Sequence, residues 1–133
     1  MPAEAMQGQA LVFDSSTLIL FLNDALPEGA VDLLHQSAQA GNAFISAIVR
    51  AEVLAWRGHT EASLNAARAL MDVCHLVPVG AAVADEAARL RRDTGLKLPD
   101  ALIAATALLQ PAMLVTANGR DFRRVPALLL IET

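Results

Sequence analysis

The chain alternates short apolar runs with longer segments of helical periodicity, and this alternation limits the folds open to it more than any other feature. The apolar runs are too short for helices and predict strands at residues 11–13, 43–45, 74–79, 113–115 and 128–131, the third of them broken by Pro78. Strands that alternate with helices favour an α/β fold with a mostly parallel sheet. In such sheets ligands collect at the carboxyl ends of the strands.

The segments between these runs carry start and stop signals for helices. A Pro, Ser or Thr opens several of them and a Gly closes others, as is usual at helix termini. The predicted helices are residues 17–23, 28–40, 47–56, 60–72, 81–94 and 99–109.

Composition fits one compact domain. The 133 residues are 55% hydrophobic, which is enough for a single core, and we expect one domain over residues 1–133 with residues 1–9 as a flexible extension. Cys74 is the single cysteine, so no internal disulfide can form. No signal peptide or membrane-spanning stretch is present, and we therefore expect a soluble, cytoplasmic protein.

The net charge of −4 is the wrong sign for a protein that binds nucleic acid by bulk electrostatics. Any nucleic-acid contact must be local or bridged by cations.

Four acids stand out by their position. Asp14 follows an apolar strand and precedes an apolar helix, where it acts either as a helix N-cap or as a ligand. Asp100 lies in the first turn of a helix that is apolar nearly all round, a place that the helix dipole also favours. Asp121 lies in a loop, where an Asp is usually solvated or caps a turn.

Glu52 is harder to explain as surface charge. Its neighbours at helical spacing are apolar, and a carboxylate on an apolar stripe is costly unless it is paired or binds metal. The alternatives are a buried pair with a distant arginine, or a helix turned so that Glu52 reaches solvent.

Taken together, the four acids predict a metal site. Carboxylates that converge at one end of a sheet repel each other unless a cation neutralises them, and oxygen ligands select Mg²⁺ or Mn²⁺. A water activated by that cation would attack a phosphodiester, which points to a nuclease.

At these acids the chain resembles the PIN-domain family and, within it, the VapC-like toxins. The matching segments are LVFDSSTLI at 11–19, ISAIVRAEVL at 45–54, LPDALIAATA at 98–107 and LVTANGRDF at 114–122. Each segment alone is weak, but all four occur in the family's order and at its spacing.

The resemblance implies a three-layer α/β/α fold with four to five strands and a Mg²⁺- or Mn²⁺-dependent endoribonuclease. It implies that Asp14, Asp100 and Glu52 hold the metal, that Asn118 or Asp121 fills a fourth position, and that Ser16 and Thr116 support the site by hydrogen bonding. It also implies an RNA substrate, a homodimer and a VapB-like antitoxin that blocks the site.

Other assignments remain open. Arg120 and Arg123, with Arg124, either contact RNA phosphate or pair with surface acids. The alternatives to a toxin are an inactive PIN-type binding module and a housekeeping RNA-processing nuclease. A phosphatase of the haloacid dehalogenase type would need a second Asp where Ser16 stands.

Overall fold

The computed structural model describes residues 8–133. The predicted extension at residues 1–9 therefore lies almost wholly outside the described part. The elements, in chain order, are β1 (Leu11–Phe13), α1 (Ser15–Leu22), α2 (Glu28–Gln39), β2 (Ala43–Ser46), α3 (Ala47–Leu54), α4 (Glu61–Asp72), β3 (His75–Val77), α5 (Ala81–Thr94), α6 (Leu98–Leu109), β4 (Met113–Thr116), the 3₁₀ turn η2 (Phe122–Arg124) and β5 (Leu130–Glu132).

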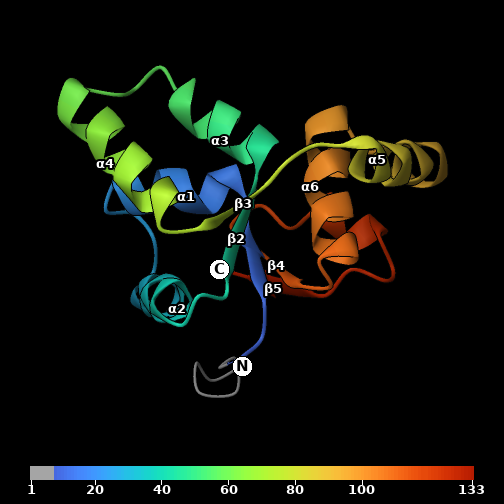
Figure 1. The fold of residues 1–133 in the computed structure, drawn as a ribbon, viewed down its shortest axis with the longest axis horizontal. Coiled ribbons are helices and arrows are strands. Elements are labelled where there is room, and N and C mark those ends of the chain that lie inside the picture. Colours follow the sequence, from blue (N-terminus) through green and yellow to red (C-terminus); the bar gives the residue numbers. More distant parts are fainter. Residues whose placement is uncertain (1–7) are drawn as a thin grey trace.

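The five strands form one parallel sheet in the order β3-β2-β1-β4-β5. Helices α1, α2 and α4 lie on one side of the sheet, and α5 and α6 lie on the other (Figure 1). The three-layer α/β/α prediction with a parallel sheet is thus confirmed. Helix α3 lies beyond the carboxyl end of β2, across the top of the sheet in Figure 1.

Local capping explains where the helices begin. The Asp14 side chain accepts from the backbone N–H of Thr17 at the start of α1, and Ser46 accepts from that of Ile48 at the start of α3. At the other end of a helix, α5 stops where Gly95 adopts φ +75°, a left-handed conformation that glycine takes without strain.

Several element boundaries differ by one or two residues from the sequence-based expectation. Helix α3 ends at Leu54, two residues before Trp56. The last strand is Leu130–Glu132 and excludes Leu128, because the backbone N–H of Leu128 donates to the Val125 carbonyl in a turn. Leu128 is buried all the same, so its apolar character marks the core and not the strand.

The three inner strands carry the centre of the core. Leu11, Val12 and Phe13 of β1 are fully buried, as are Leu114 and Val115 of β4. A strand buried on both faces reads as a continuous apolar run, which is why these two segments were recognisable. In the part of the chain that the structure describes, no helix has the length and apolar character that crossing a membrane requires.

Candidate active site

Asp14 lies at the carboxyl end of β1 and is 4% exposed. Its carboxylate accepts from the Thr17 backbone N–H at 3.0 Å and from the Ser16 hydroxyl at 2.8 and 2.9 Å. The hydroxyl of Thr116, at the end of β4, donates to its second oxygen. Three donors hold this ionisable group in place, as a buried carboxylate requires.

Ser16 and Thr116 also fix the loop after β4. The Ser16 oxygen accepts from the Ala117 N–H at 3.3 Å, and the Thr116 oxygen accepts from the Asn118 N–H at 2.9 Å. The structure therefore brings both predicted supporting residues onto Asp14 and joins the ends of β1 and β4 through them. Chain order reverses at β1, which lies between β2 and β4, and such switch points are where parallel sheets bind ligands.

Glu52 enters this region from α3 and is partly exposed. The Ser15 hydroxyl donates to its Oε1 at 3.0 Å. Burial is the main cause that raises the pKa of Glu52. The Ser15 hydrogen bond opposes that rise, and the charges of Asp100 and Asp14 add to it. Of the two alternatives to a site residue, the pair with an arginine is not seen within residues 8–133, whereas the partial exposure of Glu52 means that its side chain does reach solvent.

Asp100 lies in the first turn of α6 and is also partly exposed. Burial raises its pKa most, followed by the negative charges of Asp121 and Asp14, while Lys97 and Arg124 act in the opposite direction. The helix dipole alone would lower the pKa of this carboxyl. Desolvation and the neighbouring acids act in the opposite direction and raise it.

Asp121 and Asn118 were the two candidates for a fourth position. Asp121 lies just before η2, where its Oδ1 is 3.5 Å from Nη2 of Arg124, and its charge reaches Asp100. Asn118 is exposed, and within the described residues its side chain makes no hydrogen bond. The electrostatics therefore favour Asp121.

Four acids from four separate segments thus act on one another at the carboxyl end of the sheet. A family model described as PIN domain matches residues 11–128. The chain belongs to the PIN-domain family. The match spans β1 to β4 and ends two residues before β5.

Solved structures agree with this family. The PIN domain is 27% identical to a toxin–antitoxin complex from Klebsiella pneumoniae, with a TM-score of 0.76 and coverage of 93% of this chain and 100% of that one. VapBC2 from Rickettsia felis, bound to a promoter DNA fragment, has 22% identity, a TM-score of 0.75 and coverage of 93% and 98%. DNA-bound VapBC from Salmonella typhimurium has 18% identity, a TM-score of 0.81 and the same coverage. A search of curated protein sequences gives no match.

The arginines beside the last motif of this PIN domain have different surroundings. Arg123 donates from Nε to both carboxylate oxygens of Glu132, at 3.1 and 3.0 Å, and so forms an exposed pair with a surface acid. Arg124 donates to the Thr94 carbonyl at 2.9 Å. Arg120 is exposed and makes no ion pair within residues 8–133.

The donor set suits a hard cation. In the described residues, no three His, Cys, Asp or Glu side chains lie close enough together to hold a metal ion between them. Mg²⁺ does not need three such ligands, because it usually takes one or two carboxylates and keeps several waters. Burial and like charges raise the pKa of Glu52 and of Asp100, a strain that a bound cation would relieve.

Sequence reasoning missed two contributors. Ser15 was treated only as part of a helix start, because its partner Glu52 is 37 residues away. Lys97 was not singled out, although its charge acts on Asp100 three residues later. Helical spacing on α6 was a signal that could have identified Lys97, whereas nothing local identifies Ser15 as the donor to Glu52.

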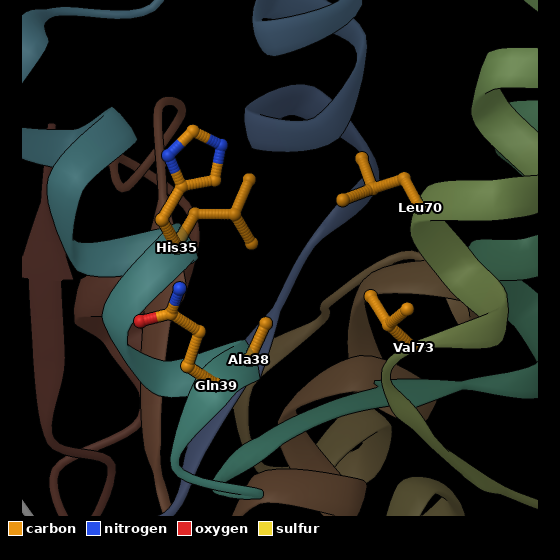
Figure 2. Close-up of a pocket in the computed structure, with 6 residues that line it drawn as sticks. His35, Ala38, Gln39, Leu70 and Val73 are labelled. Atoms are coloured by element: carbon orange, nitrogen blue, oxygen red, sulfur yellow. The ribbon is translucent and has the colours of Figure 1, made fainter.

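A concave region elsewhere has a different character. A groove of about 290 Å³ lies between α2 and α4 and is lined mainly by apolar side chains (Figure 2): Leu34, His35, Ala38, Gln39, Leu70 and Val73. No carboxylate lines it, and none of its lining residues belongs to the acidic site.

Proposed function

We propose that this PIN domain is the toxin of a toxin–antitoxin pair and that it hydrolyses RNA phosphodiester bonds with the help of Mg²⁺ or Mn²⁺. One observation carries the proposal: at the carboxyl end of the sheet, the charges of Asp14 and Asp100 act on Glu52, and the charge of Asp14 also acts on Asp100. The similarity to toxin–antitoxin complexes supports the biological role.

Asp14 and Asp100 are the proposed direct ligands, and Glu52 is the third acid. Asp14 is held by hydrogen bonds from Ser16, Thr17 and Thr116, so it offers a fixed carboxylate to the site. Glu52 and Asp121 would orient waters around the cation. When bound, the cation supplies a water of lowered pKa and offsets the negative charge of the phosphodiester.

The protein's own residues would do the rest. A raised pKa makes Glu52, which is not a proposed direct ligand, the acid best suited to accept a proton during the reaction. Arg120, which has no ion pair in the described residues, is the proposed contact to a substrate phosphate. Local cations of this kind let a chain of net charge −4 hold RNA.

The partners and location follow from the same similarity. We propose a VapB-like antitoxin as the inhibitor, a homodimer as the active assembly, and the cytoplasm as the place of action. The substrate class is single-stranded RNA, or the loops of folded RNA.

The test is cleavage of a labelled RNA that contains both a hairpin and a single-stranded tail. Purified protein should cut it with Mg²⁺ or Mn²⁺ and not with excess EDTA. Ser37→Ala is a matched control for folding and handling, because Ser37 is a buried hydroxyl in α2 that donates to the Leu34 carbonyl.

Growth measurements separate the toxin from the two alternatives. Expression of the wild type should arrest growth, and an Asp100→Asn variant should not. Harmless expression of a protein that cleaves RNA would favour a housekeeping nuclease. Failure of the purified protein to cleave any RNA with Mg²⁺ would favour an inactive binding module.

A further inference from the structure

The carboxylate of Glu52 is held by a side chain from another helix. Glu52 belongs to α3, and the Ser15 hydroxyl at the first position of α1 donates to its Oε1 at 3.0 Å. Among the described residues, no other hydrogen bond reaches this carboxylate. Its second oxygen, Oε2, therefore accepts no hydrogen bond within residues 8–133.

Ser15 and Ser16 are adjacent in sequence but serve different acids. Ser16 donates to both oxygens of Asp14, whereas Ser15 donates to Glu52. Because Asp14 is the N-cap of α1, the start of that helix is fixed relative to the Asp14 carboxylate. The Ser15 bond therefore sets the position of Glu52 relative to Asp14.

Burial and like charges both favour movement of the Glu52 carboxylate away from Asp14 and Asp100. Its ionised carboxylate is partly desolvated and is repelled by Asp100 and Asp14. The flanking residues Ala51 and Ala55 are exposed, so solvent lies beside this part of α3. A glutamate has three rotatable side-chain torsions, and rotation toward solvent would relieve both penalties.

We propose that Ser15 is a positioning residue for the metal site: it keeps the Glu52 carboxylate facing Asp14 and Asp100 by occupying Oε1 and leaving Oε2 for the cation or its water. This inference rests on the proposed function. Within the described residues, the Ser15 side chain makes no hydrogen bond to Asp14 or Asp100.

The experiment measures Mn²⁺ binding and catalysis in Ser15→Ala and Ser15→Thr, with Ser37→Ala as the control that also loses one hydroxyl. Mn²⁺ affinity, measured by electron paramagnetic resonance, should fall about tenfold in Ser15→Ala. Losses of this size are typical when a residue that hydrogen-bonds to a metal-binding side chain is removed. The kcat for RNA should fall with it while KM stays the same. Ser15→Thr should restore both, because it retains the hydroxyl.

A double-mutant cycle with Glu52→Ala separates positioning from general destabilisation. If Ser15 acts through Glu52, Ser15→Ala should change Mn²⁺ affinity in the wild-type background and leave it unchanged in the Glu52→Ala background. Equal losses in both backgrounds would overturn the inference, as would wild-type Mn²⁺ affinity in Ser15→Ala. A wild-type protein that binds no Mn²⁺ would overturn the proposed metal site as well.

Discussion

The hydroxyl of Thr116 donates a hydrogen bond to the buried carboxylate of Asp14, across a separation of 102 residues. This contact joins the ends of β4 and β1, the two strands at the switch point of the sheet. Thr116 is fully buried, and its hydroxyl is directed at Asp14. One residue therefore contributes both to the core and to the candidate site.

Replacing Thr116 with valine should destabilise the protein. Valine keeps the shape but removes a donor to a charged, buried group, which typically costs about 1.5–3 kcal/mol. Urea unfolding measures this loss. Thr116→Ser, which keeps the donor, should lose less, and equal stability of the valine variant and the wild type would show that the hydrogen bond is not formed.

Asp14→Asn and Asp100→Asn should both abolish cleavage but should differ in stability. Asp14 accepts from Ser16, Thr17 and Thr116, so an amide at this position would oppose at least one donor and lower the free energy of unfolding. Asp100→Asn removes a charge that Asp14 and Asp121 repel. Thermal unfolding without metal should show a lower Tm for Asp14→Asn and an unchanged or higher Tm for Asp100→Asn; the reverse order would contradict the geometry.

The pH dependence of stability should carry the signature of the two raised pKa values. The ordinary pKa is 3.8 for Asp100 and 4.5 for Glu52, and both pKa values are higher in the folded state. At a pH between the ordinary and the folded-state pKa of either group, the folded protein therefore binds more protons than the unfolded one. Stability therefore falls as pH rises through this window and stays lower at neutral pH. Both carboxyls are partly exposed, so solvent screening keeps each penalty small.

Urea titrations of metal-free wild type, Asp100→Asn and Glu52→Gln from pH 3.5 to pH 7, a range that brackets the ordinary pKa values of these carboxyls, test this point. The wild type should lose stability relative to each variant as pH rises. Parallel curves for all three proteins would show that these carboxyls are not perturbed.

Arg120 and Arg123 should differ in their effect on RNA affinity. Arg123 is engaged by Glu132, whereas Arg120 makes no ion pair in residues 8–133. Arg120→Ala should therefore weaken RNA binding and lower its salt dependence, and Arg123→Ala should change RNA affinity little. Fluorescence anisotropy with a non-cleavable RNA at several salt concentrations measures both; a larger loss for Arg123→Ala would reverse the assignment.

The parts of this molecule that could be predicted from sequence are those that depend on neighbours along the chain. Asp14 and Ser46 cap helices within three residues of themselves, and the strand at residues 11–13 is buried on both faces, so each leaves a local pattern. The resemblance of the four motifs supplied the arrangement of the acids.

The remaining features depend on contacts between residues far apart in sequence, which no local sequence pattern indicates. Ser15 meets Glu52 and Arg123 meets Glu132 because the folded chain brings them together. The apolar run at 128–131 was ambiguous for a similar reason, since burial alone does not distinguish Leu128 in a turn from Leu130 in the strand.

The most direct test of the account is cleavage of single-stranded RNA by wild type and Asp100→Asn, each with Mg²⁺ and with excess EDTA. The wild type should cleave only with Mg²⁺, and the variant should not cleave in either condition although it remains folded with an unchanged or higher Tm. Undiminished cleavage in EDTA, or a wild-type rate in Asp100→Asn, would contradict a metal-dependent nuclease built on this acidic cluster.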